Sequence, residues 1–385
     1  MRILVVHNYY KIPGGEDSVF ENEVRLLKDR GNEVTEYTRH NRDMGIKELI
    51  FEAPFSRKTY RDIRQIIREK NIEIVHVHND RFLISPSVFA AARDDGVPVV
   101  KTLHNFRLIC INAMLTRGGK VCRECIEDGT VHILPALKYG CFRKSRILTY
   151  LNLRINRAAV KNRAYDGVKF IALTDFNRDI FVRSGLCTEE DIYLKPNFTF
   201  KPEITADTVE EKQDFLYLGR IDPLKGIEDI LNEWTKLPES FVLKIAGSGE
   251  EGYEKELKQR FDRKNILFLG KLSHDTAMEE LRASKAMLFT SRLYEGVPMT
   301  IIESFSLGTP VIGLDFGNGG SIISSIYSRK EPLLKDIHEL SERIESFDED
   351  LKKGLYEINE GNLASFLPDR NYNMLMEIYE KCLRS

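Results

Sequence analysis

Two glutamates stand among apolar residues in the second half of the chain. Glu295 and Glu303 occur in SRLYEGVPMTIIESFSLG, where many neighbours are aliphatic or aromatic. A buried carboxylate is destabilising unless a cation or a hydrogen-bond donor pairs with it. The two side chains therefore predict a bound group that donates hydrogen bonds to carboxylates. The alternative is a pair of unrelated surface glutamates.

The pattern around these glutamates predicts a strand, a loop and a helix. AMLFTS is typical of a strand, SRLYEGV of a loop, and PMTIIESFSLG of a helix with Pro298 in its first turn and Gly308 at its end. With a helical rise of about 1.5 Å per residue, the two carboxylates would lie roughly 10 Å apart. That distance is too wide for one shared metal or proton, but it suits hydroxyl groups on either side of a diphosphate.

The start of this helix is itself a candidate anion site. Backbone N–H groups in the first turn of a helix lack partners and suit phosphate oxygens. The residues concerned are Gly296, Val297 and Thr300. We therefore expect the diphosphate between the two glutamates.

Two cations follow the first strand of the second half. LYLGRIDPLKG places Arg220 directly after a strand and Lys225 just before a helix that begins near Ile227. Ligands of open α/β sheets bind beyond the carboxyl ends of the strands, so both cations should face the ligand. Guanidinium and ammonium groups suit a pyrophosphate. The alternative is a solvated turn.

Length and composition fit a chain of two domains. The chain has 385 residues, and roughly 100 to 200 residues make one domain. Lys and Arg (57) nearly balance Asp and Glu (59), which argues against a nucleic-acid partner. The first residues lack the apolar length of a signal peptide, and no apolar run approaches the roughly 18 residues of a membrane span. We therefore expect a cytoplasmic protein.

Short β-rich runs alternate with helical segments, and this cycle restarts after residue 197. Such alternation predicts two doubly wound α/β domains with parallel sheets. The expected divisions are 1–198 for the first domain, 199–213 for a charged linker and 214–366 for the second domain. Residues 367–385 predict an amphipathic helix that packs back toward the first domain.

Glu295 and Glu303, with Gly219-Arg220 and Lys225 upstream, resemble the Glu-x7-Glu signature of the family-4 retaining glycosyltransferases. The resemblance covers nearly the whole chain. It implies the GT-B fold, in which two Rossmann-like domains face each other across a cleft. The first domain would bind the acceptor and the second the nucleotide sugar.

The resemblance also implies roles for single residues. Glu303 would bind the nucleotide ribose and Glu295 a hydroxyl of the donor sugar. Arg220 and Lys225 would hold the pyrophosphate. The Leu272 region of GKLSHD would contact the base.

A second glycine pattern is a competing signal. Gly247-Ser-Gly249-Glu-Glu-Gly252 follows a strand and matches the dinucleotide fingerprint. A nicotinamide site also needs an acidic residue about 20 positions further on, where this chain has Leu269-Gly270-Lys271. We therefore interpret Gly247 as part of a tight turn at the floor of the donor site.

The first half offers a glycine pair and a histidine. Gly14-Gly15 follows the first strand, where adjacent glycines permit close backbone approach to a ligand, although an ordinary turn is the alternative. The pair resembles the family's Gly-Gly-x-Glu loop, except that Glu16 follows the glycines directly. His104 ends the strand VPVVKTLH, and the resemblance implies an active-site histidine that holds the donor sugar.

The expected chemistry needs neither a protein nucleophile nor a metal. In the mechanism usual for the family, the departing phosphate itself takes the acceptor proton on the same face of the sugar. Cations and the helix start would stabilise the leaving diphosphate. Metal-dependent transferases use D-x-D, and the match at Asp348-Glu349-Asp350 lies in a polar stretch. We therefore expect no catalytic metal or cofactor.

Four cysteines are close together in the sequence. Cys110, Cys122, Cys125 and Cys141 contain one C-x2-C pair and have the number, and roughly the spacing, of a structural zinc site. The outer spacings depart from those of a standard zinc ribbon. Four reduced thiols in a packed loop are the alternative.

Residues 143–163 are strongly basic. This segment, RKSRILTYLNLRINRAAVKNR, holds seven basic residues and no acidic one, with helical periodicity. A basic amphipathic helix binds anionic membrane surfaces. The alternative is an ordinary packed helix with a solvated face, so peripheral attachment to the inner face of the membrane stays open here.

Taken together, the sequence predicts a metal-independent retaining glycosyltransferase. It would move a hexose or N-acetylhexosamine from a nucleotide sugar, expected to be a UDP-sugar, to a saccharide or lipid-linked saccharide. Capsule or lipopolysaccharide synthesis is the expected setting. The alternatives are a non-catalytic scaffold that binds sugar nucleotides and a nicotinamide-dependent oxidoreductase.

Overall fold

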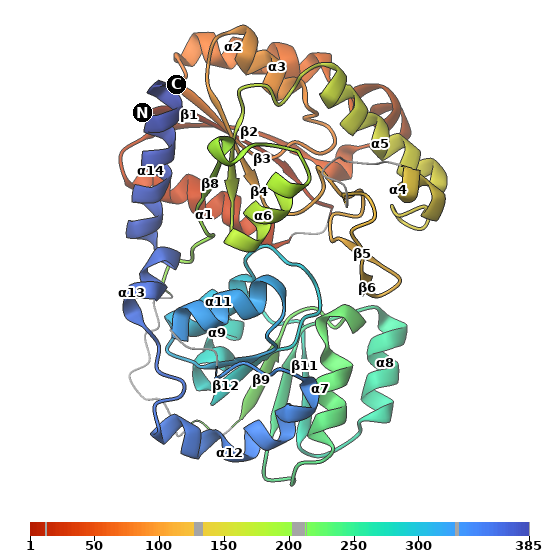
Figure 1. The fold of residues 1–385 in the computed structure, drawn as a ribbon, viewed down its shortest axis with the longest axis vertical. Coiled ribbons are helices and arrows are strands. Elements are labelled where there is room, and N and C mark those ends of the chain that lie inside the picture. Colours follow the sequence, from red (N-terminus) through yellow and green to blue (C-terminus); the bar gives the residue numbers. More distant parts are fainter. Residues whose placement is uncertain (12–13, 127–133, 202–211, 213, 328–330, 385) are drawn as a thin grey trace. The chain divides into compact units, whose positions relative to one another are not determined.

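The computed structural model describes residues 1–11, 14–126, 134–201, 212, 214–327 and 331–384. The chain divides into two compact units, each described here by itself (Figure 1). Unit 1 consists of Met1–Asn197 with Pro368–Ser385, and unit 2 of Phe198–Leu367. Most of the segment 199–213, expected to be a linker, lies outside the described residues.

Unit 1 is built on a six-stranded parallel sheet. The strand order is β2-β1-β3-β4-β7-β8. The strands are β1 (Arg2–Tyr9), β2 (Glu33–His40), β3 (Ile74–Asn79), β4 (Val99–Leu103), β7 (Lys169–Ala172) and β8 (Ile192–Leu194). The central strands β3 and β4 are buried along their whole length, as expected for a parallel sheet covered on both faces.

Helices cover both faces of this sheet. The helices are α1 (Gly15–Asp29), α2 (Arg57–Lys70), α3 (Ser87–Asp94), α4 (Leu134–Tyr139), α5 (Arg146–Lys161), α6 (Asp175–Arg183) and α14 (Pro368–Arg384). Short turns η1 (Asn41–Asp43), η2 (Glu48–Glu52) and η3 (Glu189–Asp191) and a hairpin of β5 (Thr116–Arg117) and β6 (Lys120–Val121) complete the unit. Helices α2 and α3 lie on the face of the sheet opposite α1 (Figure 1).

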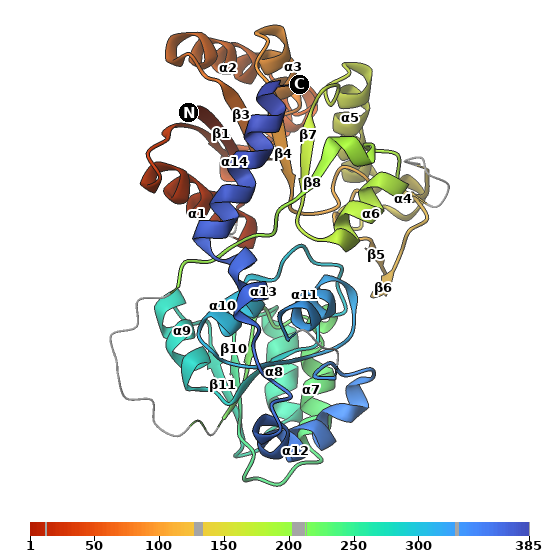
Figure 2. The same cartoon turned by 60° about the vertical axis from the view of Figure 1, so that its left-hand side comes forward.

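The last helix, α14, belongs to the core of unit 1. Leu375, Ile378 and Tyr379 are buried and pack in one cluster with Phe20 of α1 and Ile3 of β1. Figure 2 shows α14 crossing the sheet beside β3 and β4. The apolar stripe that the sequence predicts in this helix therefore covers one face of the sheet together with α1.

Unit 2 is built on a five-stranded parallel sheet. The strand order is β11-β10-β9-β12-β13. The strands are β9 (Phe215–Leu218), β10 (Leu243–Ala246), β11 (Ile266–Gly270), β12 (Ala286–Phe289) and β13 (Val311–Gly313). The predicted fold class, two doubly wound α/β units with parallel sheets, is confirmed.

The helices of unit 2 also lie on both faces of their sheet. They are α7 (Ile227–Trp234), α8 (Glu251–Arg260), α9 (His274–Ala283), α10 (Met299–Ser306), α11 (Gly317–Tyr327), α12 (Leu340–Lys352) and α13 (Glu360–Leu363), with the short turns η4 (Pro223–Lys225), η5 (Ile337–Glu339) and η6 (Ala364–Phe366). Helices α7 and α8 lie on one side of the sheet and α9 on the other (Figure 1). Among the described residues, no helix has both the length and the apolar character that crossing a bilayer requires.

Parallel pairing has a direct consequence for function. The carboxyl ends of all strands in a parallel sheet meet at one edge, and ligands of such sheets bind there. The candidate residues Arg220, Gly247, Leu272 and Glu295 each follow a different strand of unit 2. His104 directly follows β4 in unit 1. Each unit therefore gathers its polar candidates at a single edge.

Candidate functional site

The loops after β9 and β12 are locked together in unit 2. Gly226 has a positive φ of 75°, and a Cβ on it would lie 2.4 Å from the backbone oxygen of Thr290. The backbone N–H of Arg292 donates to the oxygen of Leu224 at 2.9 Å. Only a glycine permits this close approach. The contact aligns the two loops so that Lys225 reaches Glu295.

Glu295 and Lys225 form a partly buried ion pair. Lys225 Nζ lies 2.6 Å from Glu295 Oε2, with 20% and 19% of the side chains exposed. The Ser291 hydroxyl donates to Oε1 at 2.5 Å, and the Asn318 amide donates to the backbone oxygen of Glu295. The first glutamate therefore has partners within the protein. Ser291 and Asn318 were not among the predicted residues, because hydrogen bonds across loops leave no periodic signal.

Arg220 is an exposed cation at this edge. Its side chain is 60% exposed, and its guanidinium lies 3.2 Å from Asp222. The Tyr217 hydroxyl donates to the backbone oxygen of Arg220 at 2.6 Å and holds the turn after β9. An exposed ion pair of this kind is weak, so Arg220 can exchange its partner for a phosphate oxygen at little cost.

Glu303 contrasts with Glu295. It lies on α10 with 9% of its surface exposed, and its carboxylate makes no hydrogen bond or ion pair with the residues that the structure describes. Burial raises the pKa of this carboxyl group, and the nearby His274 side chain opposes the increase. A buried carboxylate in this state gains stability from any ligand that donates hydrogen bonds to it.

The start of α10 lies between the two glutamates in the sequence. The predicted helix boundaries are confirmed, since α10 begins at Met299 after Pro298, and Gly308 has a positive φ of 70° just beyond its end. No side chain caps the amino end. Gly296 and Thr300 are partly exposed there, whereas Val297 is buried. The arrangement fits the predicted anion site.

Packing within unit 2 requires two of the glycines that match the dinucleotide fingerprint. A Cβ on Gly247 would lie 1.8 Å from the backbone oxygen of Gly219, and a Cβ on Gly249 would lie 2.2 Å from that of Ile221. These glycines let the chain leaving β10 pack against the chain leaving β9. The predicted tight turn is wrong, because the segment continues as extended chain and Gly249 pairs with Ile221 in a parallel bridge. Leu272 is partly exposed at the end of the neighbouring strand β11.

In unit 1, Gly14 and Gly15 begin α1. The backbone N–H of Gly14 donates to the Asp17 carboxylate at 2.9 Å, which caps the helix. Neither glycine has a positive φ, and no described atom lies within 4 Å of a Cβ added at either position. The described protein therefore leaves open space beside both glycines, as the predicted ligand approach requires.

His104 opens into a small polar pocket of unit 1. The pocket is lined by Glu16, His78, Asn79, Asp80, Arg81, Lys101, Thr102, Leu103, His104, Asn105, Arg107 and Leu108. Burial and the neighbouring rings of His78 and His7 lower the pKa of His104 well below its usual value. His104 is therefore a neutral imidazole at neutral pH.

Glu16 is a pocket residue that the sequence did not assign. It accepts hydrogen bonds from the Tyr10 hydroxyl at 2.5 Å and from the Asn105 amide at 3.1 Å. Burial raises its pKa, although Tyr10 and the guanidinium of Arg107 oppose this effect. Glu16 therefore occupies the position after the glycines with its carboxylate already held in place.

A sequence signal marks this edge of the sheet, and two of its four residue pairs line the pocket. Four of the eight histidines precede an asparagine and stand at or just beyond the carboxyl end of a strand: His7-Asn8 (β1), His40-Asn41 (β2), His78-Asn79 (β3) and His104-Asn105 (β4). These four strands are neighbours in the sheet. A polar pair repeated at four adjacent strand ends marks this edge, whereas each pair by itself is unremarkable.

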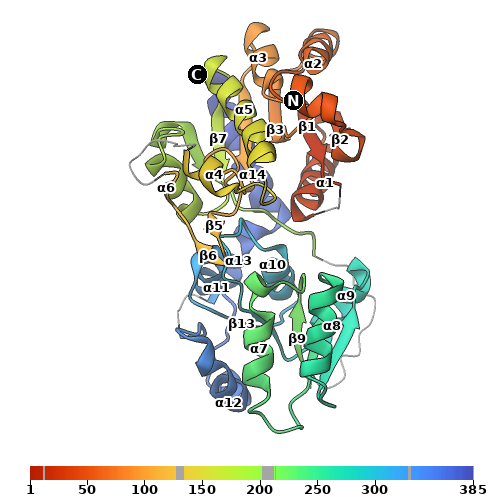
Figure 3. The ribbon, with the colours of Figure 1, turned by 90° about the vertical axis from the view of Figure 1, so that its right-hand side faces the viewer.

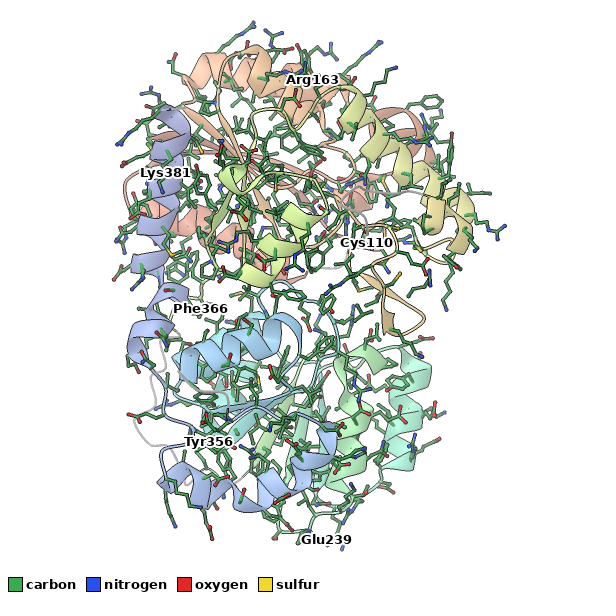
Figure 4. The ribbon with its side chains drawn as sticks, in the orientation of Figure 1. Cys110, Arg163, Glu239, Tyr356, Phe366 and Lys381 are labelled. Atoms are coloured by element: carbon green, nitrogen blue, oxygen red, sulfur yellow. The ribbon has the colours of Figure 1, made fainter. Side chains whose placement is uncertain are left out.

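The four cysteines lie beside one another but do not form an assembled site. Cys110 follows β4 (Figure 4), Cys122 follows β6, and Cys125 and Cys141 pack in one apolar cluster with Ile111, Ala136 and Leu153. Burial, followed by the neighbouring thiols, raises the pKa of Cys125 to about 11. In the described part of the chain, no three of these sulfur atoms lie close enough to share a metal ion.

Helix α5 has both basic and apolar side chains on its outer face. It lies beside α4 (Figures 1 and 3) and buries Asn152, Leu153, Ile155 and Ala159. Ile147 and Val160 are 73% and 74% exposed, and Tyr150 is also exposed. Exposed Arg146, Arg157 and Lys161 lie on the same side. Ile147 therefore faces outward, whereas Ile155 is buried.

Comparison with known proteins supports one class of enzyme. Residues 201–354 match the family described as "Glycosyl transferases group 1". An uncharacterized glycosyltransferase of Methanocaldococcus jannaschii is 22% identical over 99% of this chain and 98% of its own length. The lipopolysaccharide 1,6-galactosyltransferase of Escherichia coli is 29% identical over 32% of this chain and 37% of its own.

A third relative names a lipid-linked glycan. An alpha-1,4-N-acetyl-D-galactosaminyltransferase of Campylobacter jejuni, named for GalNAc-alpha-(1->4)-GalNAc-alpha-(1->3)-diNAcBac-PP-undecaprenol, is 29% identical over 36% of this chain and 37% of its own.

Solved structures share the whole fold. Anabaena HepE in complex with UDP has a TM-score of 0.66 at 16% identity, covering 99% of this chain and 100% of that one. A glycosyltransferase from Rickettsia africae has a TM-score of 0.70 at 15% identity, covering 100% and 99%. The chain therefore has the GT-B fold, and its matches support the glycosyltransferase class.

Proposed function

We propose that this protein is a retaining glycosyltransferase that transfers a hexose or N-acetylhexosamine from a UDP-sugar to a saccharide or lipid-linked saccharide acceptor. The observation that carries the proposal is the buried carboxylate of Glu303, which has no partner among the residues that the structure describes, beside an uncapped helix start. The paired Glu295 and Lys225 lie at the same strand edge. The solved HepE complexes with UDP and with UDP-glucose support the donor class.

The geometry of unit 2 suggests how a nucleotide sugar would bind. Ribose hydroxyls would donate to Glu303, and the diphosphate would lie on the N–H groups at the start of α10 with Arg220 beside it. A diphosphate oxygen would also attract Lys225 away from Glu295. Glu295 would then be free to accept a hydroxyl of the transferred sugar. The ion pair would thus keep both groups ready while the site is empty.

Catalysis would rest on stabilising the leaving group. As the bond between sugar and phosphate breaks, negative charge grows on the diphosphate, where Arg220, Lys225 and the helix start would stabilise it. The leaving phosphate would take the acceptor proton on the same face of the sugar, so stereochemistry would be retained. No step of this scheme needs a metal ion or a cofactor.

The polar pocket of unit 1 would serve the sugars. His104, Glu16 and Arg107 present acceptor and donor groups of the kind that bind carbohydrate hydroxyls. The Escherichia coli relative's name specifies lipopolysaccharide, and the Campylobacter relative's name an undecaprenol-linked glycan. These names support an acceptor in the synthesis of a surface polysaccharide such as lipopolysaccharide or capsule.

The two alternatives are less well supported. The glycines that suggest a nicotinamide site are explained by the contact of Gly247 with Gly219. A non-catalytic scaffold would have no use for a pocket around the neutral imidazole of His104. Release of UDP or GDP from a panel of nucleotide sugars, with and without lipid-linked acceptors, tests the proposal directly, because a scaffold binds without turnover.

Substitutions should separate donor binding from transfer. We expect Glu303→Ala to raise the donor Kd by about tenfold or more, since it removes hydrogen bonds to a charged group. Glu295→Ala and His104→Ala should mainly lower kcat, because their contacts strengthen during sugar transfer. Titration calorimetry with UDP and single-turnover transfer measure the two effects. Glu345→Ala, an exposed site on α12, is the control, and unchanged binding and turnover in all three variants would refute the assignment.

UDP affinity should depend on the protonation of Glu303. Burial raises the pKa of this group in the free protein, so part of it is protonated at mildly acidic pH. Ribose hydroxyls donate stronger hydrogen bonds to the ionised form than to the protonated form, so binding lowers this pKa and releases a proton. We therefore expect affinity to rise with pH through the raised pKa and to fall as the pH drops.

Calorimetry in buffers of different ionisation enthalpy measures that proton release. Phosphate groups of UDP also titrate, so the informative quantity is the difference between the wild type and Glu303→Gln. The variant cannot release a proton at this position. Equal proton release by both proteins would contradict the ribose-binding role.

We also propose that the outer face of α5 contacts anionic membrane. Its exposed cations and its exposed Ile147, Tyr150 and Val160 combine charge attraction with apolar insertion. Each cation near an anionic surface contributes about 1 kcal/mol. Arg146→Glu/Arg157→Glu should therefore weaken binding to phosphatidylglycerol vesicles by tenfold or more, on the order of two such contributions.

Vesicle co-sedimentation tests whether the outer face of α5 binds anionic membrane. The matched control is Arg57→Glu/Arg61→Glu, which makes the same charge change at exposed positions of α2. The control should bind like the wild type, and neither protein should bind neutral phosphatidylcholine. An equal loss of binding in both double variants would show that total charge, and not this face, is responsible.

We propose a structural zinc ion at the four neighbouring cysteines. Binding would require the thiols to lose their protons and to move closer together, which a metal with thiolate ligands drives. The protein as purified should then contain about one zinc per chain, measured by metal analysis, and Cys122→Ser should lose it. Cys187→Ser, a half-buried thiol elsewhere in unit 1, should retain it. Zinc-free protein purified without chelators would exclude the site.

A further inference from the structure

A buried chain of hydrogen bonds leads to His104 in unit 1. Glu23 Oε1 lies 3.0 Å from His78 Nε2, and His78 Nδ1 lies 3.0 Å from His104 Nε2. Glu23 and His78 are almost completely buried, whereas His104 reaches the pocket. The centroids of the two imidazole rings lie 5.1 Å apart at an interplanar angle of 22°, so the rings lie edge to edge and nearly in one plane, as a hydrogen bond between ring nitrogens requires. The three side chains come from α1, β3 and the end of β4.

The hydrogen-bond network that leads to His104 begins at an ionised carboxylate, Glu23. Burial opposes the charge on Glu23, but Lys195, His76 and His78 together hold its pKa well below its usual value. Lys195 Nζ lies 2.7 Å from Glu23 Oε2, so the second carboxylate oxygen is occupied by a cation. Glu23 can therefore only accept hydrogen bonds.

The cluster is a hydrogen-bond network and not a vacant metal site. Glu23, His76 and His78 have the types and spacing of metal ligands. However, His76 Nε2 contacts the Thr102 hydroxyl at 2.8 Å, and its Nδ1 contacts the Tyr379 hydroxyl at 2.7 Å and Glu23 at 2.9 Å. A metal ion there would displace these bonds and lie near the ammonium group of Lys195.

The direction of the hydrogen bonds follows from the carboxylate. Because Glu23 accepts, His78 Nε2 must carry the hydrogen. A neutral imidazole has one N–H, so His78 Nδ1 holds a lone pair and accepts from His104 Nε2. His104 then carries its hydrogen on Nε2 and has a lone pair on Nδ1. In the described structure, His104 Nδ1 makes no further hydrogen bond within the protein.

We propose that Glu23 and His78 are positioning residues that fix His104 as the tautomer with hydrogen on Nε2, so that Nδ1 accepts a hydrogen bond from a sugar hydroxyl in the pocket. The identity of that hydroxyl depends on the proposed function, whereas the tautomer does not. Burial lowers the pKa of His78 to about 3, even though Glu23 opposes this, so the connecting ring stays neutral.

This assignment gives His104 a defined role. A neutral ring with a fixed lone pair accepts a hydroxyl hydrogen without having to choose between tautomers when the sugar arrives. The surrounding pocket groups, Lys101, Arg107 and Asn105, are donors, and Glu16 is the one carboxylate besides Asp80. Asp80 is paired with Lys101 at 2.6 Å. His104 therefore supplies an unpaired neutral acceptor at this position.

The tautomer can be measured on the full-length wild-type protein without any ligand. Long-range nitrogen–proton NMR of protein labelled at histidine distinguishes a protonated from an unprotonated ring nitrogen. The signals of His104 are assigned by their loss in His104→Gln. We expect hydrogen on Nε2 in both His78 and His104 at neutral pH. Hydrogen on Nδ1 of His104, or a charged ring, would overturn the proposal.

The Glu23→Gln variant tests whether Glu23 determines the tautomer of His104. Lys195 requires an acceptor, so the amide oxygen of Gln should face it and the NH2 group should face the imidazoles. The order then reverses: His78 accepts at Nε2 and donates from Nδ1, and His104 carries its hydrogen on Nδ1. The expected NMR result is this inversion. Glu21→Gln, on the exposed side of the same helix, should leave the tautomer unchanged.

Kinetics separates positioning from a merely structural role. With fold retention checked by circular dichroism, Glu23→Gln should lower kcat by about tenfold, the size of one lost hydrogen bond, and leave the Kd for UDP within about twofold. An unchanged His104 tautomer in folded Glu23→Gln would refute the proposal that Glu23 and His78 fix it. A protein without transferase activity but with the expected tautomers would refute the proposed function alone. If Glu23→Gln fails to fold, the wild-type spectrum still decides the proposal.

Discussion

The buried ion pair of Glu23 and Lys195 is the contact on which the organisation of unit 1 depends. A carboxylate and an ammonium group that are both almost fully buried must be matched closely, or their desolvation would outweigh their attraction. Glu23 lies on α1, and Lys195 follows β8. His76 and His78 of β3 also contact the carboxylate, and Tyr379 of α14 contacts His76. One charge thus connects the first helix, the middle and the edge of the sheet, and the last helix.

Unit 2 also has two glutamates with little exposure, and it treats their charges in two different ways. Glu295 is paired with Lys225 and Ser291, so its charge is stabilised before any ligand binds. Glu303, only eight residues later, has no such partner among the described residues, and burial raises its pKa. A protein that leaves one buried carboxylate unpaired beside a paired one has lower stability at that place than it could have. We interpret the unpaired group as the place where a ligand completes the structure.

Much of the fold and part of the site were predictable because they depend on local patterns. Strand runs, the Pro298 and Gly308 boundaries of α10, and the positions of Arg220 and His104 after strands follow from residue type and periodicity. The Glu295–Lys225 pair, the Glu16 carboxylate and the Glu23 network were not predicted, because they join residues distant in sequence. The covered face of α5 could not be predicted, since helical periodicity alone does not say which of two mixed faces is covered, and Ile147 is exposed.

The glycines of this protein differ in whether the surrounding structure requires them. At Gly247 the protein itself requires glycine, because a Cβ would collide with the backbone oxygen of Gly219. That requirement explains a dinucleotide-like pattern without any dinucleotide. At Gly14 and Gly15 the described protein requires nothing, since the space beside both residues is open and φ is negative. The described protein would therefore tolerate side chains at Gly14 and Gly15, whereas it would not tolerate one at Gly247.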